Sequence, residues 1–123
     1  MKYLFLLAVA FSLIANERDH KAPYITGDGF RSIADHLFDE TSRDISIEKI
    51  KSYDSIFVKS DFLSQFINEI LPQISTPFIV ISHNSDHGPE PKHNRLADNK
   101  HLVAWFAQNC SKYSHDKLIP IPI

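Results

Sequence analysis

The hydrophobic pattern of the chain is strongest at residues 77–87, where a continuous apolar run passes directly into a polar one. Phe78 to Ile81 show no alternation, which is typical of a strand buried on both faces of a helix-covered parallel sheet. The next residues, Ser82 to His87, carry hydroxyl, imidazole, amide and carboxylate groups. Such a polar tip is typical of a strand whose carboxyl end opens on a binding crevice. We therefore predict a central strand over Pro77–Ile81.

A strand, a helix and a strand follow one another in the middle of the chain. Ser55–Lys59 is the first strand, and Ser60 or Asp61 is a suitable N-cap for the helix that follows. Pro72 is expected to end or kink that helix. The helix has one apolar face, formed by Phe62, Leu63, Phe66, Ile67, Ile70 and Leu71. With the central strand these elements predict a βαβ unit with a right-handed crossover.

The segment before this unit is punctuated by glycine. Tyr24–Phe30 predicts a very short strand and then a turn. The apolar spacing over Arg31–Phe38 predicts a helix, with Asp28 at the position of an N-cap. Three isoleucines beyond it predict a short edge element, namely Ile45, Ile47 and Ile50.

The segment after the unit predicts a second part of the sheet. Gly88–Pro91 reads as an exposed loop, and Arg95–Asn99 as one helical turn. Leu102–Phe106 predicts another buried strand, with a helix as the alternative. In Leu118–Ile123 two prolines exclude a central strand and predict an edge or extended segment. The fold class predicted for residues 23–123 is α/β, a Rossmann-like parallel sheet with flanking helices.

Composition and charge bound the possible functions. The 123 residues are enough for one domain, and 43% hydrophobic with 23% charged residues is ordinary for a globular protein. The net charge of −2 gives no sign of a nucleic-acid partner. Cys110 is the single cysteine of the chain, so no intrachain disulfide forms, and a buried structural thiol is expected.

The first 15 residues have the layout of a signal peptide. Lys2 precedes the apolar run Tyr3–Ile14, and Ala15 offers a small residue for cleavage. The run is shorter than the ~20 residues of a membrane span. The alternatives are an uncleaved anchor, or a buried N-terminal helix or strand. We expect an exported chain, or one associated with a membrane through this segment.

Polar residues follow three of the predicted strands and are expected to share one edge of the sheet. They are Lys59 to Asp61, Ser82 to Asp86, and Gln108 with Asn109, joined by Thr26, Asp28 and Arg31 from the N-terminal turn. Amide, hydroxyl and carboxylate groups suit the hydroxyls of a sugar. Trp105 and Phe106 are candidates for its apolar ring face, although a core position is the more usual one for such side chains.

Three residues are candidates for acid–base chemistry. His83 is the first, because imidazole titrates near neutral pH; the alternative is that it caps the strand through local backbone. Asp86 and Asp28 are candidates for a base or a hydroxyl-binding carboxylate, and helix or turn capping is their alternative.

The sequence contains no recognised metal-binding or nucleotide-binding signature. His83, Asp86, His87 and His93 fall close together, but their spacing matches no zinc signature. No phosphate-binding glycine motif and no nucleophile elbow occurs. We therefore expect no metal and no cofactor.

Five segments together resemble the N-terminal half of exostosin-like glycosyltransferases and their uncharacterised bacterial and viral relatives. They are Tyr24–Arg31, Ile56–Lys59, Ile81–Asp86, Trp105–Asn109 and Lys117–Ile123, and the last two, W-F-x-Q-N and K-L-I-P-I-P-I, are the most specific. The resemblance covers residues 23–123.

The resemblance implies half of a two-domain, GT-B-like architecture. In such transferases the C-terminal domain holds the nucleotide-sugar donor and the N-terminal domain contributes the glycan acceptor side. It implies acceptor-side or structural roles here for Asp28, Arg31, His83, Asn84, Asp86 and Asn109. Within that group, His83 or Asp86 is the predicted acid–base residue, and the others are predicted to bind substrate.

The second domain of such transferases does not follow in this sequence, so we expect the chain alone to be inactive. Its apolar last segment, Leu118–Ile123, favours a truncated product or one domain of a longer protein. Two alternatives stay open. One is a non-catalytic module that binds a glycan or a protein, and the other is an inactive remnant.

Overall fold

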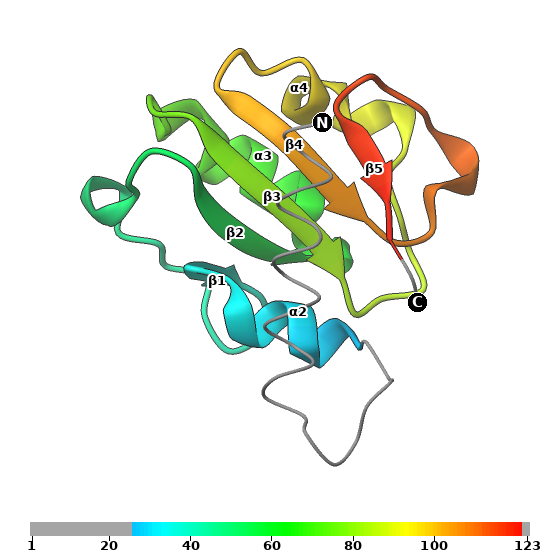
Figure 1. Cartoon of the computed structure of the whole chain (residues 1–123), viewed down its shortest axis with the longest axis horizontal. Helices are drawn as coiled ribbons and strands as arrows, with labels where there is room; N and C mark the ends of the chain where they lie inside the picture. The colour runs from blue at the N-terminus through cyan, green and yellow to red at the C-terminus, as the bar shows by residue number, and fades with distance from the viewer. Residues whose placement is uncertain (1–25, 122–123) are drawn as a thin grey trace.

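A computed structural model describes residues 26–121, and in this range one five-stranded, all-parallel sheet is formed with the order β1-β2-β3-β4-β5 (Figure 1). The strands are β1 (His36–Phe38), β2 (Asp54–Lys59), β3 (Phe78–His83), β4 (Leu102–Ala107) and β5 (Leu118–Pro120). The predicted α/β, Rossmann-like class is confirmed.

Short helices connect the strands. Those of the α type are α2 (Gly27–Ile33), α3 (Leu63–Glu69) and α4 (Asn94–Ala97). Single 3₁₀ turns are η1 (Ile47–Lys49), η2 (Ser60–Phe62), η3 (Leu71–Gln73), η4 (Pro91–His93) and η5 (Cys110–Lys112). The order β2, η2, α3, η3, β3 is the βαβ unit that the sequence predicts.

The central strand β3 is buried along its whole length, as its unbroken apolar run predicts. Its alternate residues enter two separate cores. Phe78 and Val80 face the core that contains α3 and α4, which we call the α3 face of the sheet. Ile79 and Ile81 face the core that contains Phe30 of α2, which we call the α2 face. Because consecutive strand residues point to opposite sides, burial on both faces requires an apolar residue at every position.

The polar residue Ser82 lies inside the α3-face core and has a dedicated partner. Trp105 is fully buried, and its Nε1 donates a 2.8 Å hydrogen bond to Ser82 Oγ. A buried indole N–H without a partner is destabilising, so this bond lets the largest side chain of the core pack between strands and helices.

The N-terminal elements differ from the prediction. Gly27–Phe30 is helical rather than a turn, and α2 ends at Ile33 instead of extending to Phe38. Thr26, not Asp28, is the N-cap, because its side chain accepts a 3.1 Å bond from Gly29 N. His36–Phe38 is the strand β1, paired with Ile56–Val58. Tertiary pairing with β2 therefore overrides the local helical spacing.

Ser60 and Asp61 are also not N-caps. They form the 3₁₀ turn η2, and the side chain of Asp61 instead binds residues of neighbouring elements. The α-helix proper ends at Glu69, and Pro72 lies in the first turn of η3, in agreement with its predicted role as a helix breaker.

The later predictions are mostly confirmed. Leu102–Ala107 is a strand, so the helical alternative is wrong, and α4 is the predicted single turn. β5 is an edge strand of the described sheet, as Pro120 requires. The loop at residues 88–91 differs, because Pro89 is buried and Pro91 begins η4. The isoleucine-rich segment forms the 3₁₀ turn η1.

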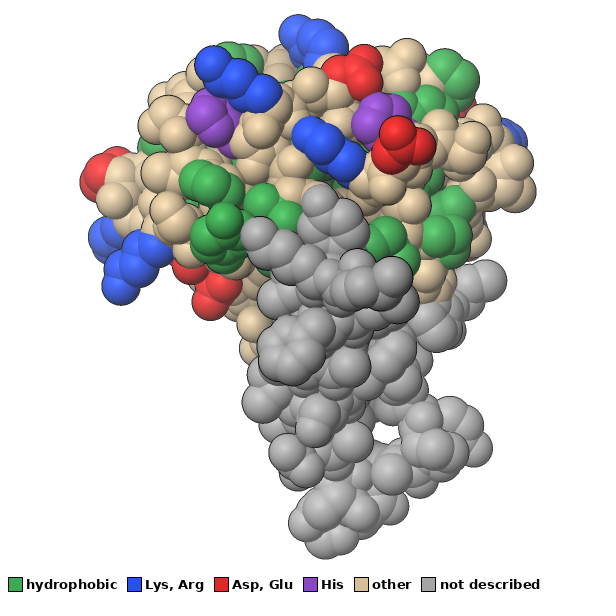
Figure 2. Space-filling view, turned by 45° about the horizontal axis from the view of Figure 1, so that its top comes forward, with side chains coloured by type: hydrophobic (Ala, Val, Ile, Leu, Met, Phe, Trp, Pro, Cys, Tyr) green, Lys and Arg blue, Asp and Glu red, His purple; other side chains and the backbone are tan. Residues whose placement is uncertain are grey.

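The predicted signal segment lies outside the described residues. Within residues 26–121, no helix combines the length and the apolar character that crossing a membrane requires. The surface in Figure 2 carries acidic, basic and histidine side chains that are interspersed rather than gathered into one charged patch.

We predict that Trp105→Phe lowers the free energy of unfolding by about 2–3 kcal/mol, because it leaves a cavity and removes the donor to the buried Ser82 hydroxyl. Urea denaturation followed by circular dichroism measures this. The exposed Lys100→Ala is the control and should change the free energy by less than about 0.5 kcal/mol. Equal stability of the two variants would show that the hydrogen bond and the indole volume contribute nothing.

Candidate functional site

The carboxyl ends of β2, β3 and β4 meet at one edge of the sheet, as predicted. Ser85, just after β3, donates from Oγ to Asp61 Oδ1 at 2.5 Å. From the other side, Asn109 donates from Nδ2 to the Ser85 carbonyl at 3.0 Å. Ser85 N donates to Gln108 Oε1 at 3.4 Å. The turn after the central strand is thus tied to both neighbouring strands.

A second tie connects this turn to α2, on the α2 face of the sheet. Asn84 has φ 63°, a left-handed conformation that asparagine tolerates better than most residues. Its Nδ2 donates to Asp28 Oδ1 at 3.1 Å. A Cβ on Gly27 would lie 1.6 Å from Asn84 Oδ1 and 2.4 Å from His83 Nδ1. Only glycine therefore allows α2 to approach the end of β3 this closely.

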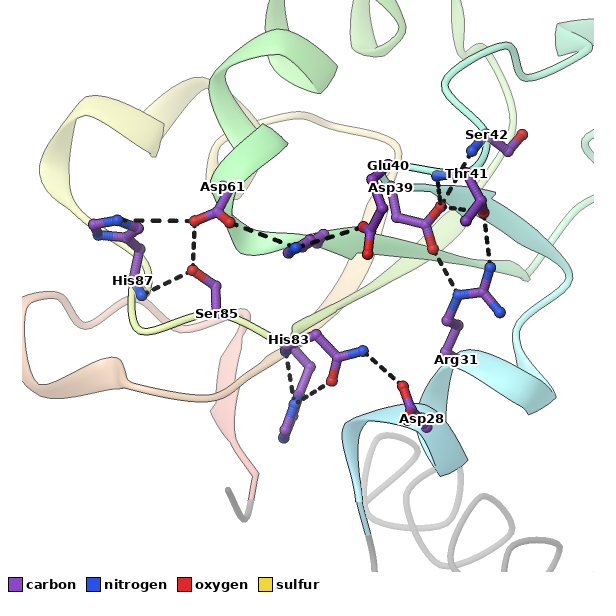
Figure 3. A network of polar contacts seen from close by, with 12 residues as sticks. Asp28, Arg31, Asp39, Glu40, Thr41, Ser42, Asp61, His83, Ser85 and His87 are labelled. Carbon is purple, nitrogen blue, oxygen red and sulfur yellow. Dashed lines mark hydrogen bonds and ion pairs between the residues drawn. The ribbon is translucent and has the colours of Figure 1, made fainter.

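A cleft of about 330 Å³ lies along this edge, next to α2. Its lining residues are Asp28, Arg31, Asp39, Glu40, Thr41, Phe57, Lys59 and Asn84. We call it the Asp28 cleft. Three carboxylates and two cations give the lining a formal charge of −1. Figure 3 shows Asp28, Arg31, Asp39, Glu40 and Thr41 near one another.

One wall of the Asp28 cleft is held by a partly buried ion pair, in which Asp39 is buried and Arg31 is partly exposed. Arg31 Nε donates to Asp39 Oδ2 at 2.6 Å, and Arg31 Nη2 donates to Thr41 at 2.9 Å. Asp39 Oδ1 accepts three further bonds, from Thr41 N, Thr41 Oγ1 and Ser42 N. Burial by itself would raise the pKa of Asp39, but the hydrogen bonds from Thr41 and Arg31 outweigh it and lower that pKa to about 2. Asp39 is therefore charged at neutral pH and fixes Arg31 in place.

Lys59 connects the Asp28 cleft to the rest of the edge. Its Nζ lies 3.6 Å from Glu40 and 3.8 Å from Asp61. Asp61 in turn lies 3.8 Å from His87 Nε2, besides its bond to Ser85. Figure 3 shows Glu40, Asp61 and His87 spread along this edge, with Ser85 bonded to Asp61.

The two predicted acid–base residues differ in their surroundings. His83 is 4% exposed, and its Nδ1 accepts the backbone N–H of Asn84 at 2.8 Å, which is the capping role weighed above. Asp86 is exposed and lines a separate hollow of about 150 Å³ on the other side of the turn. Neither residue lines the Asp28 cleft.

The predicted binding residues divide into two groups. Asp28, Arg31 and Asn84 line the Asp28 cleft together. Asn109 lies elsewhere: its amide donates to the backbone carbonyls of Ser85 and His87 and fixes the loop.

Trp105 is fully buried in the α3-face core, which confirms the core position that was the more usual alternative and excludes contact with a sugar ring. Sequence reasoning also missed Asp39, Glu40 and Thr41. These residues follow β1, and recognition of His36–Phe38 as a parallel strand would have placed them at the same edge.

The other reactive groups of the described residues are potential metal ligands and the Cys110 thiol. Among residues 26–121, no group of three or more histidine, cysteine or acidic side chains is placed to hold a metal ion. Burial raises the pKa of the Cys110 thiol, whose Sγ lies 3.2 Å from the Ala107 carbonyl. This thiol is a poor nucleophile at neutral pH.

The pKa of Asp39 predicts a specific acid sensitivity. The pKa of Asp39 in the folded state lies below the ordinary 3.8, so the charged form of Asp39 stabilises the folded protein. This stabilisation is complete above about pH 4 and is lost as the pH falls through about 2. It amounts to about 2 kcal/mol at neutral pH. Asp39→Asn should therefore be less stable than wild type by at least this amount at pH 7, and the difference should shrink towards pH 2. Urea denaturation across the range measures it, and a difference independent of pH would contradict the assignment.

The close approach of Gly27 predicts that Gly27→Ala forces Asn84 and His83 to move. We expect a loss of about 1–3 kcal/mol in the free energy of unfolding, despite the better helix propensity of alanine. Chemical denaturation measures the free energy of unfolding. The NMR chemical shift of the Asn84 side-chain amide reports whether its hydrogen bond to Asp28 is lost. Wild-type stability and an unchanged amide shift would show that the contact is not tight.

Comparisons of this chain with protein-family models, with curated proteins and with solved structures find no match. The resemblance to exostosin-like transferases thus rests on the five segments described above. The parallel-sheet fold and the positions of the polar residues at its edge are observed in the structure.

Proposed function

We propose that this chain is the acceptor-side domain of a glycosyltransferase and that the Asp28 cleft binds a hydroxyl group of a glycan acceptor. The observation that carries the proposal is the cleft itself, which lies at the carboxyl edge of a parallel sheet and is lined by carboxylate, amide, hydroxyl and guanidinium groups. This edge is the usual ligand site of open α/β sheets. The segments that resemble exostosin-like proteins support the same assignment.

The volume and charge of the cleft favour the acceptor over the donor. A cleft of about 330 Å³ is at the small end of ligand pockets, which span roughly 300–1,000 Å³, and suits one sugar ring. Its net negative lining disfavours the diphosphate of a nucleotide sugar. Arg31 and Lys59 do not offset this, because both are already paired with carboxylates of the same cleft. A nucleotide-sugar donor would be held by a second domain.

Asp28 is the carboxylate best placed for the acceptor. It is exposed, lines the cleft, and its Oδ1 is oriented by Asn84. In this role Asp28 accepts the hydrogen bond of an acceptor hydroxyl, and a carboxylate in that position also accepts the proton as the hydroxyl oxygen attacks the anomeric carbon of the donor. The bond between the donor sugar and its phosphate breaks as the new glycosidic bond forms, and the nucleoside diphosphate leaves.

A non-catalytic glycan-binding module is the second candidate. Its specific support is that both cations of the cleft are already paired, Arg31 with Asp39 and Lys59 with Glu40. Neither His83 nor Asp86 lines the cleft to act as a second acid–base group. A cleft of this kind binds hydroxyls well without transferring them.

We predict that the full chain binds neutral glycans more tightly than nucleotide sugars and that Asp28→Ala weakens glycan binding about tenfold, as expected for one hydrogen bond to a charged group. Isothermal titration with a panel of neutral oligosaccharides and of uridine and guanosine diphosphate sugars measures both. Glu48→Ala, an exposed carboxylate of η1, is the matched control and should leave binding unchanged.

The outcomes separate the candidates. Glycan binding that depends on Asp28 supports the acceptor site, and transfer to that glycan when a donor-binding domain is supplied identifies the enzyme. Glycan binding without any transfer favours the module. Tight binding of the nucleotide sugar alone, or of neither ligand, would overturn the proposal.

A further inference from the structure

A second hollow, of about 270 Å³, lies on the opposite side of the Ser85 turn from the Asp28 cleft. It is formed by η2, the start of α3, the loop that leads into η4, and η4 itself. Its lining residues are Ser60, Asp61, Ser64, His87, Glu90, Lys92 and His93. We call it the Ser60 hollow. None of these residues belongs to the Asp28 cleft.

The hydroxyl of Ser60 is the unusual group of this hollow. Ser60 is 5% exposed, and its Oγ has no hydrogen-bond partner among the described residues. The large majority of buried side-chain polar atoms have a hydrogen-bond partner, either in the protein or in an ordered water. Because Ser60 lines the hollow, a molecule bound there can supply the missing bond.

His93 supplies a second oriented group. It is 3% exposed, and its Nδ1 accepts the backbone N–H of Glu90 at 3.0 Å. Its ring packs edge-on against Trp105 with a centroid distance of 6.3 Å, which fixes the orientation. Burial lowers the pKa of His93, so the ring is neutral at physiological pH and its proton is on Nε2. His93 therefore presents one hydrogen-bond donor.

The lysine that lines the Ser60 hollow is already paired with a carboxylate of the same hollow. Lys92 lies 3.8 Å from Glu90, and Asp61 lies 3.8 Å from Lys59. A phosphate would need an unpaired cation, and a divalent metal would need converging acidic or imidazole groups, which the described residues do not form. Hydroxyls, with both donor and acceptor capacity, match Ser60, Ser64 and Nε2 of His93.

We propose that the Ser60 hollow is a binding site for a neutral, hydroxyl-bearing molecule of the size of one sugar ring, held by hydrogen bonds to Ser60 Oγ and His93 Nε2. Its volume lies just below the roughly 300–1,000 Å³ of pockets for larger ligands. The site is distinct from the Asp28 cleft and goes beyond the proposed acceptor function.

The test is a heteronuclear NMR titration of the full chain with D-glucose, D-galactose, D-mannose and N-acetyl-D-glucosamine in turn, and with inorganic phosphate and Mg²⁺ as charged probes. We expect at least one of the sugars to shift the backbone amides of Asp61, Ser64 and His93. Ser60→Ala should weaken that binding about tenfold. Ser60→Ala should fold, because Ser60 Oγ has no partner in the protein to lose.

Two control variants make the result specific. Ser75→Ala, an exposed serine between η3 and β3, should bind like wild type. Asp28→Ala should also leave these shifts unchanged, so failure of the acceptor proposal and failure of this one are separable. The inference is overturned if no sugar shifts these amides, if only phosphate or Mg²⁺ does, or if Ser60→Ala binds as tightly as wild type. The first of these results would leave an ordered water as the partner of Ser60.

Discussion

All strands of the described sheet run in the same direction, and this constraint determines where the polar residues lie. A parallel strand must return through a crossover before the next strand begins, so every carboxyl end emerges at the same edge. The strands also occur in sequence order from β1 to β5, with β3 in the centre. The turn after β3 is therefore flanked on both sides by other strand ends, and its polar side chains have neighbours to bind.

That turn joins the two helical layers of the domain. Asn84 reaches Asp28 of α2 on one side, and Ser85 reaches Asp61 of η2 on the other. The left-handed conformation of Asn84 redirects the chain between them. The Asp28 cleft and the Ser60 hollow are consequently separated by one short turn.

Much of the sheet could be predicted from the sequence. Phe78–Ile81 is apolar at every position because β3 is covered on both faces, and its polar tip is visible in the sequence. β1 could not be predicted in the same way. His36–Phe38 is only three residues long, and its spacing with Ile33 is also that of a helix. Pairing with β2 decides the outcome, and such pairing leaves no local signal. With β1 missed, Asp39 was missed as well.

The sequence by itself determined the fold class, the central strand and the chemical nature of its tip, because burial on two faces and polarity at a strand end are local properties. Only the tertiary structure decided which groups meet. Asp28 and Asn84 are 56 residues apart and are joined because α2 packs on the end of β3. Trp105 lies near the end of β4, close to the polar residues that follow this strand. Its side chain nevertheless points into the core and donates a hydrogen bond to Ser82. Strand order and face, which local patterns do not encode, explain these differences.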